Sequence, residues 1–187
     1  MSAMAKYVAF LRAINVGSHV VKMDQLRQMF KAMGFSNVET FITSGNVIFD
    51  STSGNTRSLE VKIEGHLQKK LGYAVATFVR SIPELADVAG YNPFESELNA
   101  GGKSLFIGFL KSRPGAEATR KLEACSSKTD TFHVHEREVY WLIHGGTFSS
   151  SGFSGARMEK TLGAPTTIRN VTTVKRIASK LAAAGSS

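Results

Sequence analysis

Two groups of polar and glycine residues adjoin apolar stretches near the start of the chain. An arginine, a glycine loop and the free amides at a helix start are typical of anion binding. The alternative is that asparagine and serine side chains hydrogen-bond the backbone of turns. The ligand-binding candidates are Arg12, Asn15, Gly17, His19, Ser44, Gly45 and Asn46.

Positive charge gathers near the end of the chain. The formal net charge is +8, and the segment Arg157–Lys180 holds six basic residues against Glu159. A basic surface can attract phosphate groups or nucleic acid, whereas a solvated helix face is the ordinary alternative. The basic-patch candidates are Arg157, Lys160, Arg169, Asn170, Lys175, Arg176 and Lys180.

Other reactive side chains predict no catalytic or metal site. His133 and His135 share one face of a predicted strand, but a closed zinc site needs more ligands than their surroundings offer. Cys125 is the only cysteine, and we expect it to be a small core residue. Gly102-Lys103-Ser104 lacks the first glycine of a P-loop. We therefore expect no metal and no cofactor, and no residue is assigned to catalysis.

The first half of the chain has the element order of a ferredoxin-like unit. An apolar run at Lys6–Ile14 is typical of a strand covered on both faces. Ser44-Gly45 is predicted to be a hairpin turn in which glycine takes a positive φ. The full order is βαββαβ. The predicted elements are strand Lys6–Ile14, helix Lys22–Met33, strands Val38–Thr43 and Asn46–Asp50, helix Thr56–Leu71 and strand Ala74–Arg80.

The second half repeats this order less regularly. A capping box from Ser81 to Glu84 begins a short helix, and Phe94–Gly102 is a predicted linker. A strand at Lys103–Leu110, a helix ending near Cys125, a hairpin, a serine- and glycine-rich loop, a helix, a short strand and a last helix follow. We therefore predict an α+β fold of two ferredoxin-like halves packed together. Residues 1–80 form the first half, 81–102 a helix and linker, and 103–187 the second half with its basic C-terminal helix.

Several motifs resemble a bacterial family catalogued as domain of unknown function 1697. They are LRAINVG, FITSGNVIF, NPF and LGAPTTIRNVTTVKRI, and the resemblance covers nearly the whole chain. The chain has Ala13 and Ser18 where members commonly have glycine, and Val171 where they commonly have tryptophan. The resemblance implies a two-part ferredoxin-like α+β fold. It implies no established activity, cofactor or substrate.

Composition indicates a soluble cytoplasmic protein. Hydrophobic residues make up 42% of the chain, enough for a sizeable core. No apolar run reaches the roughly 18 residues that a transmembrane helix needs. The N-terminus lacks the pattern of a signal peptide, and a single cysteine allows no internal disulfide. We expect no membrane association.

The favoured functional hypothesis is binding of a phosphate-bearing or other anionic ligand, a class that includes nucleic acid. Against sequence-specific RNA binding, the third strand, NVIFD, lacks the basic and aromatic pattern of RNA-binding domains. One alternative is a small-molecule enzyme of unknown reaction at the Asn15/Asn46 edge, with His19 as the proton carrier. Another is a protein-interaction module that uses a sheet face. The sequence specifies neither the ligand nor the oligomeric state.

Overall fold

The computed structural model describes residues 3–184, apart from the side chains of Thr43 and Ser44. The chain divides into two compact units. One unit comprises Met1–Ala86 with Ile177–Ser187, and the other is Asp87–Arg176. The last helix, α7 (Val171–Ala184), therefore contributes residues to both.

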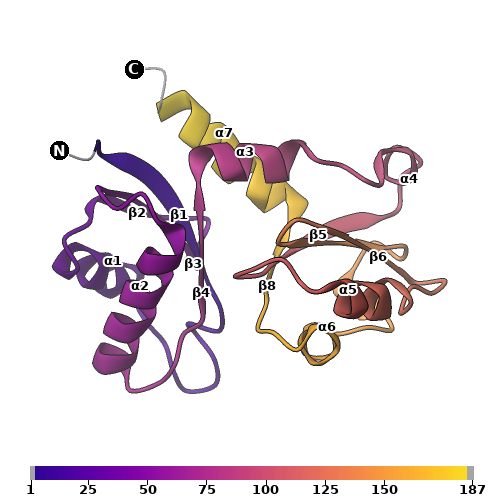
Figure 1. Cartoon of the computed structure of the whole chain (residues 1–187), viewed down its shortest axis with the longest axis horizontal. Helices are drawn as coiled ribbons and strands as arrows, with labels where there is room; N and C mark the ends of the chain where they lie inside the picture. The colour runs from indigo at the N-terminus through magenta and orange to yellow at the C-terminus, as the bar shows by residue number, and fades with distance from the viewer. Residues whose placement is uncertain (1–2, 185–187) are drawn as a thin grey trace. The chain divides into compact units, whose positions relative to one another are not determined.

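The N-terminal unit contains one antiparallel sheet in the order β2-β3-β1-β4. Figure 1 shows helices α1 and α2 on one face of this sheet. The order is that of a ferredoxin-like βαββαβ unit, as predicted. Its elements are β1 (Ala5–Leu11), α1 (Met23–Ala32), β2 (Ser36–Phe41), β3 (Thr43–Ser51), α2 (Thr56–Leu71) and β4 (Thr77–Ser81), and α3 (Ile82–Gly90) follows.

The central strand β1 is buried on both faces. Ala9 and Leu11 belong to the core beneath the helices, which also includes Leu26 of α1 and Ile63 of α2. Phe10 points to the opposite face and is likewise fully buried. The prediction of a strand covered on both sides is therefore confirmed as far as Leu11, whereas residues 12–14 lie beyond the end of β1.

The second unit has the same topology, with the sheet order β6-β7-β5-β8. Strands β1 and β5 occupy equivalent central positions, so the prediction of two similar α+β halves is confirmed. A short helix, α4, lies within the predicted linker at residues 94–102, which is therefore not wholly irregular. The elements are α4 (Glu95–Asn99), β5 (Ser104–Phe109), α5 (Ala116–Glu123), β6 (Asp130–His135), β7 (Glu138–Ile143), the 3₁₀ helix η1 (Phe148–Ser150), α6 (Gly155–Leu162) and β8 (Thr167–Asn170).

The strand registers reveal a correspondence that sequence similarity does not. Val8 of β1 pairs with Arg80 of β4, and Ile107 of β5 pairs with Arg169 of β8. Each guanidinium donates to the carbonyl of its preceding residue, at 3.0 and 2.9 Å respectively. Burial lowers the pKa of Arg169 to about 10 because desolvation disfavours the charged form. The fourth strand of each half thus carries a largely buried arginine at the same register position.

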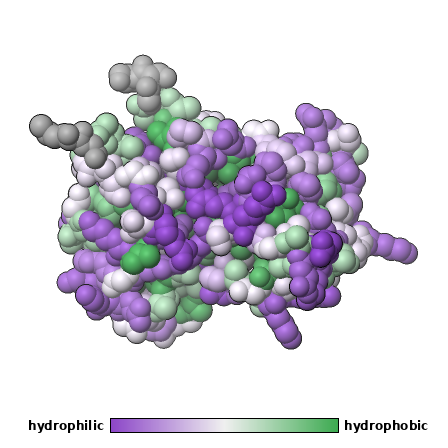
Figure 2. All heavy atoms as spheres, viewed as in Figure 1, coloured by the Kyte–Doolittle hydropathy of each residue, from purple (hydrophilic) through white to green (hydrophobic). Residues whose placement is uncertain are grey.

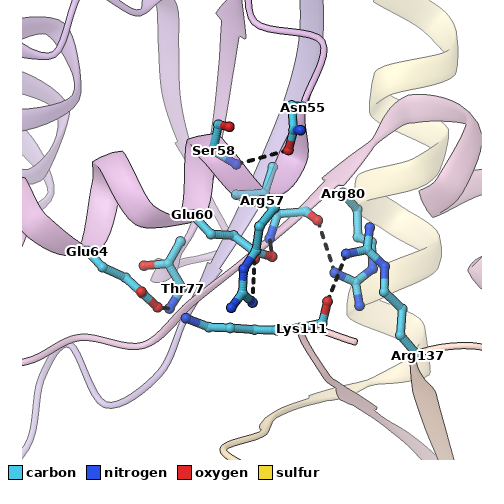
Figure 3. A network of polar contacts seen from close by, with 10 residues as sticks. Asn55, Arg57, Ser58, Glu60, Glu64, Thr77, Arg80, Lys111 and Arg137 are labelled. Atoms are coloured by element: carbon cyan, nitrogen blue, oxygen red, sulfur yellow. Dashed lines mark hydrogen bonds and ion pairs between the residues drawn. The ribbon is translucent and has the colours of Figure 1, made fainter. Parts of the chain in front are cut away.

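Glutamate side chains hydrogen-bond backbone amides at or next to the outer strands β4 and β8 of the two sheets. Glu60 accepts a hydrogen bond from the amide of Val79 at 3.0 Å, and Glu64 accepts one from Thr77 at 2.8 Å. Figure 3 shows both side chains reaching from α2 toward β4. In the second half, Glu159 accepts from Thr166, next to β8, at 2.9 Å. These carboxylates occupy amides that would otherwise be available for pairing with another strand.

The hairpin between β2 and β3 differs from the prediction. The turn lies at Ile42, which has φ +67°, and Phe41 pairs with Thr43. Gly45 is inside β3 rather than at the turn, so that prediction was wrong. A one-residue connection forces the positive φ onto a β-branched side chain, which sequence preferences disfavour.

Removing the Glu60 carboxylate should destabilise the fold. In Glu60→Ala the amide of Val79 loses its acceptor, and an unsatisfied buried donor costs about 1–3 kcal/mol of unfolding free energy. Urea denaturation measures this loss. Glu117→Ala, which removes an exposed ion pair with Lys121, is the control and should cost less. Equal losses in the two variants would show that the edge contact is unimportant.

Candidate anion-binding groove

A groove of about 390 Å³ lies between the outward side of α2 and the C-terminal end of α1. We call it the lysine groove, after Lys62 and Lys69, which line it together with His66. Figure 2 shows mainly hydrophilic side chains over α2, interrupted by a small hydrophobic patch. The lining residues are Ala32, Met33, Val61, Lys62, Gly65, His66 and Lys69.

The structure of α2 determines which residues face this groove. Asn55 caps its N-terminus by accepting from the amide of Ser58 at 3.0 Å (Figure 3), and Gly72 ends it in the left-handed conformation. Buried Leu59, Ile63 and Leu67 hold the opposite side against the sheet. Groove-lining side chains therefore recur at the i, i+3 and i+4 spacing of the remaining helix surface.

His66 lies among several positive charges. Burial is the main cause that holds its pKa below the ordinary value, and the positive charges of Lys70, Lys69 and Lys62 lower it further. Nε2 of His66 is buried, and among the described residues it has no hydrogen-bond partner. Three ammonium groups near a neutral imidazole create a local field that favours an anion.

Lys62 also lines a second cavity of about 260 Å³. Its Nζ lies 5.1 Å from the centroid of the Phe35 ring, a cation–π geometry. We call the second cavity the hydroxyl pocket, after Ser51, Thr52, Ser53 and Ser58. Its other lining residues are Met4, Gly34, Phe35, Leu59 and Lys62.

The residues of the predicted Asn15/Asn46 edge follow β1 or lie in β3. Phe10, near the end of β1, pairs with Asn46. The two amides nevertheless serve different turns. Asn15 accepts from the amide of Val21 at 2.6 Å, and Asn46, 1% exposed, donates to the carbonyl of Phe41 at 3.1 Å. Ligand binding at this edge stays a prediction.

The remaining edge candidates lie in the loop between β1 and α1 or in β3. Arg12, Gly17 and His19 are exposed, and Gly17 has φ +61°. The His19 ring packs on Tyr73 with centroids 4.3 Å apart. Gly45 is buried in β3, and the side chain of Ser44 lies outside the described part of the structure.

The basic-patch candidates occupy several elements. Asn170 caps α7 by accepting from the amide of Thr172 at 2.8 Å. Arg169 is largely buried, whereas Lys180 pairs with Glu39 at 2.9 Å. The other candidates are exposed, and they are Arg157 and Lys160 on α6 and Lys175 and Arg176 on α7. Nucleic-acid binding by these residues stays a prediction.

Two histidines and a tyrosine form a cluster in the second unit. The Tyr91 hydroxyl lies 2.8 Å from Nε2 of His133, and the Tyr91 ring stacks on His135 with centroids 3.9 Å apart. Among residues 3–184, no group of three or more histidine, cysteine or acidic side chains could hold a metal ion.

Within the same range, no helix has both the length and the apolar composition that a membrane crossing requires.

Asp130 organises the serine- and glycine-rich loop. Its carboxylate accepts from Trp141 at 2.8 Å and Gly152 at 3.1 Å, and from the hydroxyls of Ser151 and Thr129. Burial alone would raise the pKa of Asp130, but these hydrogen bonds outweigh it and hold the pKa below its ordinary value. One end of the loop is therefore anchored to the sheet, a role that the sequence analysis did not identify.

The lysine groove also went unrecognised in the sequence. The sequence predicts the helix Thr56–Leu71, but none of the groove-lining residues is among the predicted ligand-binding candidates. A signal was nevertheless present in the spacing around Gly65. Lys62 lies three residues before this glycine, His66 one residue after it and Lys69 four residues after it. This spacing places all three on the helix surface around Gly65.

Comparisons with known proteins identify the family and support the fold. A family model described as "Protein of unknown function (DUF1697)" matches residues 4–140. The structure is similar to that of conserved bacterial protein SP0830 from Streptococcus pneumoniae, at 22% sequence identity and a TM-score of 0.74. The alignment covers 96% of this chain and 99% of that chain. No curated protein matches the sequence. Such a structural likeness shows the fold alone.

The lowered pKa of His66 predicts a specific sensitivity to acid. As the pH falls through about 6.5, the unfolded chain takes up a proton on this residue before the folded chain does, so folding stability declines. Between about pH 7.5 and pH 5.5, the wild type should lose more unfolding free energy than His66→Gln. Urea denaturation at each pH measures both losses. The same loss in both proteins would contradict the proposed environment of His66.

Proposed function

We propose that this chain, which belongs to the DUF1697 family, binds a small phosphate-bearing ligand in the lysine groove. The family description names no activity, and the support comes from the residues of the groove. Its volume of about 390 Å³ falls in the range of small-molecule sites.

The main support for the proposal is the presence of glycine at position 65, inside α2. Glycine inside a helix costs about 0.5–1 kcal/mol relative to alanine. No steric need for glycine exists here, because a Cβ at position 65 would meet nothing within 4 Å and the residue has no positive φ. The fold alone thus offers no reason for glycine at this position. A reason appears if a ligand rests on the helix surface, where a side chain would obstruct it.

Charge and shape together indicate the class of ligand. Lys62 and Lys69 supply ammonium groups that bind phosphate as point charges. Val61, 60% exposed, and Ala32 and Met33 add an apolar surface on the same groove. An anion with a compact organic part satisfies both. A polynucleotide instead needs an extended basic surface.

Filling the groove should weaken ligand binding without harming the fold. Gly65→Gln places a side chain over the groove and removes the cost of glycine, so its unfolding temperature should equal or exceed that of the wild type. Its affinity for glycerol phosphate, measured by calorimetry, should fall at least about tenfold, which corresponds to 1.4 kcal/mol. Gly65→Ala adds only a Cβ, so it should raise the unfolding temperature and weaken binding, though less than Gly65→Gln does.

Charge removal provides a second arm of this experiment. Lys69→Ala should weaken glycerol phosphate binding by about tenfold, since charge-assisted hydrogen bonds contribute on this scale. Lys128→Ala removes the same charge from an exposed position in the other unit and should change affinity little. Equal effects of the two lysine variants, or undiminished binding by Gly65→Gln, would contradict a site in the lysine groove. Binding only of polynucleotides would also exclude it.

A further inference from the structure

The hydroxyl pocket adjoins the lysine groove, and it bears on the organic part of the ligand. Both cavities are lined by Lys62, so they lie next to each other at that side chain. We propose that the ligand is a phosphorylated sugar or polyol, with its phosphate in the lysine groove and its hydroxyl groups in the hydroxyl pocket. This inference rests on the proposed function of the groove.

The lining of the hydroxyl pocket suits a neutral, hydroxylated group. Four hydroxyl side chains come from a single short segment, residues 51–58. Each hydroxyl is both a donor and an acceptor, which matches the pattern of a sugar or polyol. Met4 and Leu59 add apolar surface against which the carbon skeleton can pack.

Three backbone amides in this segment donate hydrogen bonds to side chains of the loop itself. The amide of Ser53 donates to the Ser51 hydroxyl at 3.1 Å, and the amide of Asn55 donates to the Ser53 hydroxyl at 3.5 Å. The amide of Ser58 donates to the side chain of Asn55 at 3.0 Å. These amides therefore do not form an anion-binding nest. A hydroxyl that accepts one hydrogen bond still has its own proton to donate, so the pocket suits a neutral oxygen.

Lys62 lies where the proposed phosphate site in the lysine groove meets the proposed sugar or polyol site in the hydroxyl pocket. Its ammonium group lies over the Phe35 ring and is positioned by that contact between the basic residues and the hydroxyl groups. The Phe35 ring, 5% exposed, is thereby covered and does not offer a stacking surface to a base. The geometry therefore favours a sugar or polyol phosphate over recognition of a nucleobase.

Affinities for two phosphate monoesters test this inference by calorimetry. Glucose 6-phosphate carries hydroxyl groups, whereas butyl phosphate carries only an alkyl chain. The wild type should bind glucose 6-phosphate about tenfold more tightly, the effect of one or two net hydrogen bonds. Thr52→Val and Ser58→Ala, both at exposed positions, should remove this preference and leave the affinity for butyl phosphate unchanged. Their unfolding temperatures verify that the fold is retained.

The outcomes separate this inference from the proposed function. If butyl phosphate binds as tightly as glucose 6-phosphate and Lys69→Ala weakens both, the groove binds phosphate but the sugar inference is wrong. A mononucleotide that binds more tightly than glucose 6-phosphate also overturns it. If neither monoester binds, or if Lys69→Ala changes nothing, the proposed function itself fails.

Discussion

The contact between α2 and the first sheet is the constraint on which the candidate site depends. Leu59 and Ile63 are buried against the strands, and Glu60 and Glu64 hydrogen-bond the amides of β4. These contacts fix the rotation of the helix about its axis, because side chains three and four residues apart share one face. The opposite surface, with its lysines and Gly65, must then face outward beside the end of α1.

The residues on the outward surface of α2 do not give the highest folding stability. A glycine weakens the helix where alanine would fit, and lysines at 62, 69 and 70 surround a histidine whose protonation they oppose. The glycine costs folding free energy at any pH, and the lowered pKa of the histidine does so as the pH falls through about 6.5. Departures from local stability are expected where a surface serves a ligand. An anion bound in the lysine groove would offset the repulsion and give a reason for the open surface at Gly65.

Sequence patterns were sufficient for the architecture of both halves. The apolar run of β1 and the helical spacing in α2 are local signals, and their order βαββαβ leaves few topologies. The hairpin turn at Ile42 could not be predicted, since a positive φ on a β-branched residue violates the local preference. The equivalent arginines, Arg80 and Arg169, became visible only through strand register, because the two halves have different loop lengths.

The candidate site was harder to predict than the fold, for a physical reason. Asparagines beside glycine stand out in a sequence, yet Asn15 and Asn46 hydrogen-bond their own turns. Lysines on a helix surface do not stand out in a sequence. Whether they line a binding site depends on which element packs beside them. Here that element is the end of α1, which is distant in the chain from Lys69 and meets it only through tertiary packing.

The most direct test is the pKa of His66 measured by nuclear magnetic resonance with and without sodium sulfate, at constant ionic strength. Sulfate keeps its charge through the pH range in which histidine titrates, so any change comes from the protein. An anion in the lysine groove must raise the pKa of His66 by offsetting the nearby ammonium groups, while His144 in the other unit serves as the internal reference. We predict a saturable upward shift at His66 and little change at His144. An unchanged His66 pKa at saturating sulfate would contradict the account.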